Sequence, residues 1–166
     1  MMKKVLLSLG IFISVVFAVL LLLSFINRGT NVSMPVLGAG IGDYDQNSFG
    51  APRVGHKHKG VDIFARKGKP VVSATNGIVV FTGVKSLGGN AVVVLGSDCR
   101  FYYYAHLDKI ETSKYSLVKT NQEIGKVGNT GNAIHTPPHL HFSIMSFNPF
   151  AKKGFLDPVP ILNNAS

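Results

Sequence analysis

After residue 33 the chain consists of short β-branched apolar runs separated by turn residues, and this pattern constrains its fold more than any other feature. Asn76-Gly77 and Gly96-Ser97-Asp98 each separate two such runs, and Asn-Gly is a strong signal for a hairpin turn. The predicted strands are 69–74, 78–81, 91–95, 100–106, 124–127 and 140–144. The first four are expected to form two hairpins. We therefore expect an all-β domain with an antiparallel sheet.

Residues 5–26 are an uncharged run of 22 residues rich in Leu, Val, Ile and Phe. About 20 apolar residues match the hydrocarbon core of a bilayer. A cleaved signal peptide usually has a shorter apolar region, about 7–15 residues, followed by small residues. This run ends instead in Leu23-Ser24-Phe25-Ile26-Asn27. We predict one transmembrane helix that serves as an uncleaved signal anchor, and a cleaved signal peptide is the alternative.

The charges beside this run set its predicted orientation. Lys3 and Lys4 precede it and only Arg28 closely follows it, so the positive-inside rule keeps residues 1–4 in the cytoplasm. The chain is then a single-pass protein of the inner (cytoplasmic) membrane, with residues 27–33 as a linker. The domain at 34–166 lies in the periplasm or extracytoplasmic space, and it is exported if the anchor is cleaved.

The net charge limits the possible partners of the exported part, and the cysteine content limits how it can be stabilised. The net charge is +9, which favours anionic polymers or lipid surfaces outside the membrane, and export argues against nucleic acid. Cys99 is the one cysteine, so no internal disulfide can form. The domain must therefore be stabilised by its core or by a metal, and Cys99 is interpreted as a small, partly buried turn residue.

The histidines supply the first sign of a functional site. His139 and His141 are two residues apart in a predicted strand, so both side chains point to one face, and Leu140 and Phe142 point to the other. By the same alternation, Tyr102, Tyr104 and His106 are expected to share one face of their strand. An isolated His-x-His pair more often represents two surface histidines than a metal site.

A second cluster changes that balance. His58 and Asp62 are four residues apart, and in a straight strand their Cα atoms would lie about 13 Å apart. Two ligands of one zinc ion need a bend between them, and Gly60 stands midway. Catalytic zinc typically takes three protein ligands and a water. His58, Asp62 and one histidine of the His-x-His pair would supply that set, leaving other histidines to act on the water as general base or hydrogen-bond partner.

Three motifs in order resemble one known family. "HKGVD" at 58–62, "YYAHL" at 103–107 and "TPPHLHF" at 136–142 are similar to the lysostaphin-type, or LytM-like, zinc metallopeptidases. "FGAPR" at 49–53 fits the same pattern, and the resemblance extends over about residues 34–162. It implies a duplicated-hairpin β fold with an active-site groove over the sheet.

The resemblance also implies a function and a set of site residues. The function is hydrolysis of peptide bonds in the stems or cross-links of peptidoglycan, with one zinc ion as cofactor. His58, Asp62 and His141 correspond to the zinc ligands. His106 and His139 correspond to the catalytic histidines, one of which would take a proton from the attacking water.

Some residues near the motifs depart from the family pattern. Ser143 stands where the family commonly has Gly or Glu, and 114–122 lacks the glycines usual before the next strand. His56 and His135 match no family ligand, and we interpret them as rim or surface residues. The tyrosines at 102–104 could line a groove, but ordinary core and face packing of an alternating strand is the favoured interpretation.

Two alternatives to an enzyme remain at this point. A catalytically silent relative could regulate other cell-wall hydrolases, but such relatives typically lose ligands and this chain keeps the full set. A wall-binding module would need stacking aromatic residues, and the chain has no Trp. The sequence leaves open which bond is cut, the oligomeric state and the need for an activating partner.

Overall fold

The structure is a computed structural model that describes residues 10, 13–16, 32–53, 55–146 and 154–165. Most of the predicted membrane segment at 5–26 lies outside these residues, as do the stub at 1–4 and most of the linker. Gly10 and residues 13–16 are helical. None of the helices in the described part of the chain is both long and apolar enough to cross a bilayer.

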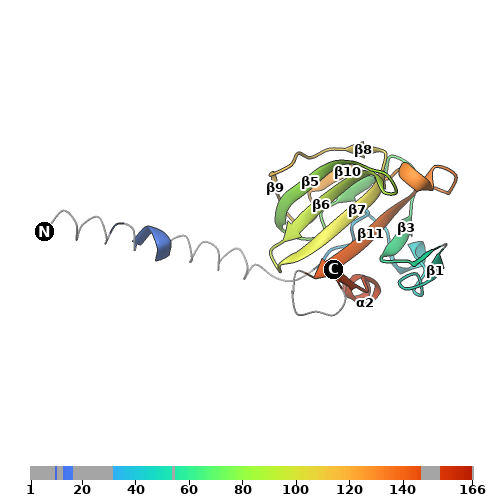
Figure 1. Ribbon diagram of the computed structural model, residues 1–166, viewed down its shortest axis with the longest axis horizontal. Coiled ribbons are helices and arrows are strands. Elements are labelled where there is room, and N and C mark those ends of the chain that lie inside the picture. Colours follow the sequence, from blue (N-terminus) through green and yellow to red (C-terminus); the bar gives the residue numbers. More distant parts are fainter. Residues whose placement is uncertain (1–9, 11–12, 17–31, 54, 147–153, 166) are drawn as a thin grey trace, which may run out of the picture.

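The domain is a set of antiparallel strands, as predicted, with very little helix (Figure 1). The large sheet has the order β12-β11-β7-β6-β5-β9, and β3 also pairs with β11. These strands are β3 (Val61–Phe64), β5 (Gly77–Lys85), β6 (Gly89–Gly96), β7 (Arg100–Leu107), β9 (Leu117–Val118), β11 (His139–Ser146) and β12 (Phe155–Leu156). Because β3 pairs with the first half of β11 and β12 with the second, β3 and β11 can present side chains to one site.

Two smaller sheets and three short helical segments complete the domain. The three-stranded sheet has the order β4-β10-β8, and β1 and β2 form a two-stranded sheet. Their bounds are β1 (Pro52–Arg53), β2 (His56–Lys57), β4 (Pro70–Val72), β8 (Lys109–Ile110), β10 (Glu123–Lys126), η1 (Ile41–Asp43), η2 (Gly131–Ala133) and α2 (Val159–Asn163). The β1–β2 pair and β3 lie at the same end of the molecule in Figure 1.

One of the two predicted hairpins is confirmed and the other is wrong. β6 and β7 form the hairpin around Gly96-Ser97-Asp98, but β4 pairs with β10, and β5 pairs with β6 and β9. The chain passes between two sheets at Asn76, whose side-chain oxygen accepts the Thr120 N–H at 3.0 Å. Gly77 is not needed for a turn but lets β5 lie close to β6, since a Cβ there would lie 2.4 Å from the Leu95 carbonyl oxygen.

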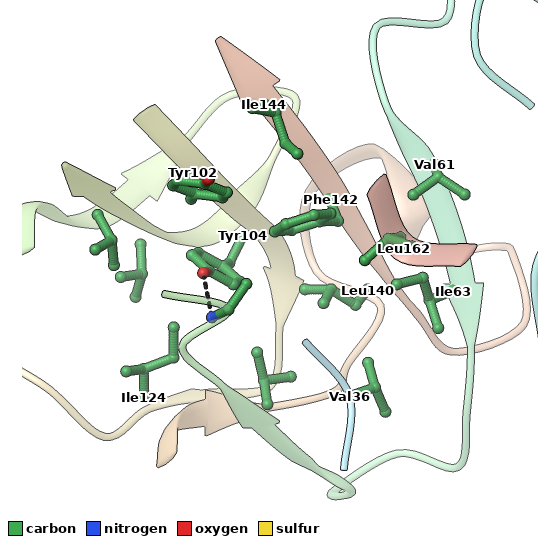
Figure 2. Packing of buried hydrophobic residues seen from close by; sticks show 14 of the residues in the cluster. Val36, Val61, Ile63, Tyr102, Tyr104, Ile124, Leu140, Phe142, Ile144 and Leu162 are labelled. Atoms are coloured by element: carbon green, nitrogen blue, oxygen red, sulfur yellow. Dashed lines mark hydrogen bonds between the residues drawn. The ribbon is translucent and has the colours of Figure 1, made fainter. Parts of the chain in front are cut away.

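The core contains side chains of both larger sheets, and its largest fully buried residues include Tyr102, Tyr104 and Phe142 (Figure 2). A buried phenol needs a partner. The Tyr104 hydroxyl accepts the Ala74 N–H at 2.9 Å, drawn as a dashed line in Figure 2. The Tyr102 hydroxyl donates to Asp98 at 2.7 Å. These two tyrosines are therefore core residues, and only Tyr103 lies near the histidines.

Residues just before the predicted boundary at residue 34 also pack against the domain. Val32 belongs to the buried core, and the Ser33 N–H donates to the Ala74 carbonyl at 2.8 Å. The Ser33 hydroxyl also bonds to the Asn121 side chain. Cys99 is in a turn as expected, but it is exposed, not partly buried.

His106 does not share a face with Tyr102 and Tyr104, so this prediction is wrong. The β6–β7 register pairs Val92 with Tyr104 and Asn90 with Leu107, which leaves two residues of β7 opposite one of β6. This β-bulge reverses the alternation. His106 has a φ of +62°, and its N–H donates to the Gly88 carbonyl at 2.7 Å. The bulge turns His106 away from the tyrosine core and toward His139 and His141.

Candidate metal centre

The structure brings His58, Asp62 and His141 together, with their potential ligand atoms all within 4.8 Å of one another. Asp62 on β3 and His141 on β11 are direct partners in the ladder, and His58 comes from the loop after β2. The Asp62 Oδ1 atom lies 2.8 Å from Nδ1 of His141 and 3.2 Å from Nε2 of His58. The two histidine nitrogens are 3.0 Å apart.

Gly60 bends the chain between His58 and Asp62, as the spacing predicts. It has a second role that the sequence does not reveal. A Cβ at Gly60 would lie 2.4 Å from the Phe142 carbonyl oxygen and 2.5 Å from the Ser143 Oγ atom. Because only glycine fits so close to β11, the loop carrying His58 can lie directly against the strand that carries His141.

Each of these three residues has an outer partner that fixes its orientation. Nδ1 of His58 lies 2.9 Å from the Ser48 carbonyl oxygen, so Nδ1 donates and Nε2 faces the centre. Nε2 of His141 lies 2.8 Å from Ser143 Oγ, and Nδ1 faces the centre. Arg53 donates to Oδ2 of Asp62 at 2.9 Å, which leaves Oδ1 for the histidines.

Sequence reasoning did not find these outer partners. Ser48 immediately precedes the "FGAPR" segment that contains Arg53, and the resemblance assigns no metal-site role to either residue. Ser143 was noted only as a departure from the family pattern. His56 and His135 are exposed, in agreement with their interpretation as rim or surface residues.

The protonation states suit a metal. Burial raises the pKa of Asp62, but hydrogen bonds and charge interactions with His141 and His58 outweigh it and hold that pKa well below 3.8, its ordinary value. Burial lowers the pKa of His141 despite its hydrogen bond to Asp62. At neutral pH the cluster therefore offers an anionic carboxylate and a neutral imidazole, and metal ligands must be deprotonated.

His106 and His139 lie beside this cluster and complete the group of histidines. Their ring centroids are 5.0 Å apart, and Nε2 of His139 is 3.9 Å from Oδ1 of Asp62. Nδ1 of His106 lies 2.9 Å from the Thr130 carbonyl, and Nδ1 of His139 lies 2.8 Å from the Pro137 carbonyl. A carbonyl only accepts, so both rings carry a proton on Nδ1, and their Nε2 atoms can accept another.

The donor set fits a zinc ion. Zinc in proteins binds imidazole nitrogen and carboxylate oxygen in tetrahedral geometry, with bonds of about 2.0–2.2 Å that place the donors about 3.3 Å apart. The three donors here lie 2.8, 3.0 and 3.2 Å apart, so shifts of a few tenths of an ångström would suffice. The absence of thiolate favours zinc over softer ions without singling it out among divalent metals.

A model of the peptidase family M23 matches residues 56–157, more than half of the chain, and this range contains all five site residues. The chain belongs to peptidase family M23. It is 37% identical to the glycyl-glycine endopeptidase ALE-1 of Staphylococcus capitis over 113 residues, 67% of this chain and 30% of that protein. It is 35% identical to the L-Ala–D-Glu endopeptidase of Bacillus subtilis over 127 residues, 71% of this chain and 37% of that protein.

Solved structures of similar proteins agree with the fold. The catalytic domain of lysostaphin from Staphylococcus simulans is 31% identical with a TM-score of 0.58, covering 82% of this chain and 94% of that one. A zinc-containing peptidase from Vibrio cholerae is 30% identical with a TM-score of 0.56, covering 69% of this chain and 36% of that one. The matches span only 30% and 37% of the two curated relatives, so the resemblance concerns a part of each of them.

Replacing Ser143 with alanine is expected to lower the zinc affinity of this M23 domain by about 10–100-fold, the usual effect of removing an outer partner. Ser143 is 1% exposed and holds Nε2 of His141, so its loss frees the ring to rotate or change tautomer. Competition with a chelator measures the affinity. Ser113→Ala, at an exposed serine, is the control. Equal affinities of S143A and the unmodified protein would contradict this role.

The metal-free protein is expected to lose stability as the pH falls from about 6.5 to about 4. Burial lowers the pKa of His106 from 6.5 to about 4, so in this window the unfolded chain binds a proton that the folded chain does not. The stability contributed by Asp62 remains complete above pH 3.8, because its pKa is lowered.

Thermal melts in chelator between pH 7.5 and 4.5 measure this loss. His106→Gln should reduce the loss without abolishing it, because the pKa of His141 is also lowered by burial. An unchanged melting temperature across the window would show that the pKa values of His106 and His141 are not lowered in the folded protein.

Proposed function

We propose that this chain is a zinc metalloendopeptidase that hydrolyses peptide bonds in peptidoglycan stems or cross-links. The observation that carries the proposal is the convergence of His58, Asp62 and His141 beside two further histidines that backbone carbonyls hold through Nδ1. The names of the similar proteins support the substrate class, since they include a glycyl-glycine endopeptidase, an L-Ala–D-Glu endopeptidase and the peptidoglycan DD-endopeptidase ShyA of Vibrio cholerae.

In this proposal His58, Asp62 and His141 hold zinc, which when bound supplies a Lewis acid that activates water and polarises the peptide carbonyl. The chain's other residues move the protons. Nε2 of His106 or His139 accepts the proton of the attacking water and returns it to the leaving amine. Burial lowers the pKa of His106, so this ring is neutral at physiological pH. The protonated ring then stabilises negative charge that develops on the carbonyl oxygen.

Digestion of purified sacculi by the full chain tests the proposal. We expect soluble fragments to be released, release to stop in chelator, and zinc to restore it. Mass spectrometry of the fragments then identifies the bond. Bound zinc without any fragment release would favour the alternative of a silent relative, although the presence of all five site residues does not favour that reading.

We also propose that residues 5–26 anchor the chain in the inner membrane with its domain outside the cytoplasm. The support is the uncharged run of 22 residues with Lys3 and Lys4 before it. A linker of seven residues, 27–33, reaches at most about 25 Å. The enzyme would then cut wall material close to the membrane. Amino-terminal sequencing of the mature protein tests this, and a start within residues 24–34 would overturn it.

A further inference from the structure

A cavity of about 270 Å³ lies beside the candidate metal centre, between the chain at 36–43 and the loop after β3. Its lining residues are Val36, Gly38, Ala39, Asp43, Phe64, Ala65, Arg66 and Lys69. Phe64 connects it to the centre. Phe64 is the ladder partner of His139, and the two ring centroids are 5.4 Å apart. A peptide bound across His139 would therefore meet the Phe64 ring and then this cavity.

The cavity is positively charged. Among the described residues neither Arg66 nor Lys69 forms an ion pair, whereas Lys67 between them pairs with Asp108 at 3.0 Å. Asp43 is the one carboxylate in the lining, and its Oδ2 atom already accepts the Gly40 N–H at 2.8 Å. Two cations and one anion leave a net charge of about +1, which is suited to a carboxylate.

Backbone hydrogen bonds hold the walls in place. The Leu37 N–H donates to the Pro70 carbonyl at 3.1 Å, which joins one wall to the other. The Lys69 N–H donates to the Arg66 carbonyl at 3.0 Å, and the Lys69 carbonyl accepts the Val127 N–H at 2.8 Å. The cavity therefore exists before a ligand arrives, which reduces the entropy lost on binding.

We propose that this cavity is a substrate subsite that binds a carboxylate of the peptide on the His139 side of the scissile bond. Arg66 and Lys69 pair with the carboxylate, and the exposed Phe64 ring packs against the apolar part of the residue that carries it. The proposal rests on the proposed function, because peptidoglycan stem peptides carry free carboxylates along a short chain.

The double variant Arg66→Gln/Lys69→Gln tests the subsite. With soluble muropeptides as substrate we expect KM to rise about tenfold and kcat to stay nearly constant, since two charge-assisted contacts outside the reacting atoms are lost. Amidation of the stem carboxylates should raise KM of the unmodified protein similarly and leave KM of the double variant unchanged. Lys67→Gln, which removes a neighbouring charge paired with Asp108, should leave KM unchanged. Equal KM values for the free and amidated substrates in the unmodified protein would overturn the subsite.

A binding measurement separates failure of the subsite from failure of the proposed function. Calorimetry with the full chain carrying His106→Ala, zinc loaded, compares the binding of the free and amidated muropeptides while hydrolysis is slowed. If the unmodified protein shows no hydrolysis but the free muropeptide binds about tenfold more tightly than the amidated one, the subsite stands and the proposed function fails. If hydrolysis proceeds and the two forms bind equally, the function stands and the subsite fails.

Discussion

Replacing Asp62 with asparagine is expected to remove zinc from the protein and to lower peptidoglycan hydrolysis at least about 10³-fold, since several kcal/mol of charge stabilisation are lost with the metal. Asp62 is the only carboxylate of the cluster, and its Oδ1 atom contacts both ligand histidines, at 2.8 Å and 3.2 Å. Asparagine has nearly the same shape but no charge, and its NH₂ group cannot bind a metal. Atomic emission measures the zinc content, and fragment release from sacculi measures hydrolysis.

The matched control is Asp45→Asn. Asp45 is exposed, and its Oδ1 atom accepts the Asn47 N–H at 2.9 Å, an interaction that asparagine preserves. This variant should keep the zinc and the activity of the unmodified protein. Full zinc content in D62N would show that Asp62 is not a ligand, and full activity without zinc would show that hydrolysis does not need the metal.

The part of the site that was predictable from the sequence depends on local geometry. Side chains in a strand alternate between faces, so His139 and His141 had to point together, and Leu140 and Phe142 had to enter the core. The bend at Gly60 follows from the reach of the chain between His58 and Asp62. The resemblance then selected His141 over His139 as the metal ligand, and in the structure His141 is the nearer to Asp62, at 2.8 Å against 3.9 Å.

The two predictions from the sequence that were wrong depend on contacts between distant segments. His106 changes face because Gly88 accepts its N–H and Thr130 accepts from its ring, and neither contact is visible in the spacing of residues along β7. The hairpin at Asn76-Gly77 fails for a similar reason. A turn signal fixes where the chain turns, but the partner of each strand is decided by which sheet buries it.

The two catalytic candidates, His106 and His139, can be distinguished from the metal ligands by measuring kcat and zinc content together. His106→Ala and His139→Ala are each expected to lower kcat by about 10²–10⁴-fold, the usual contribution of a general acid or base, with zinc content unchanged. Neither histidine belongs to the three residues whose ligand atoms converge, so the metal site should remain intact without its ring. Both rings are held through Nδ1 by backbone carbonyls, not by the metal ligands.

The control for this pair is His135→Ala, at an exposed histidine on the loop before β11, which should keep full activity. Loss of zinc from either variant would assign that histidine to metal binding, and an undiminished kcat would remove it from the proton pathway. If His106 and His139 serve one proton pathway, the double variant should be little slower than the slower single variant, because effects within one catalytic unit do not add. Additive losses would instead indicate that one ring moves the proton and the other independently stabilises the charge on the carbonyl oxygen.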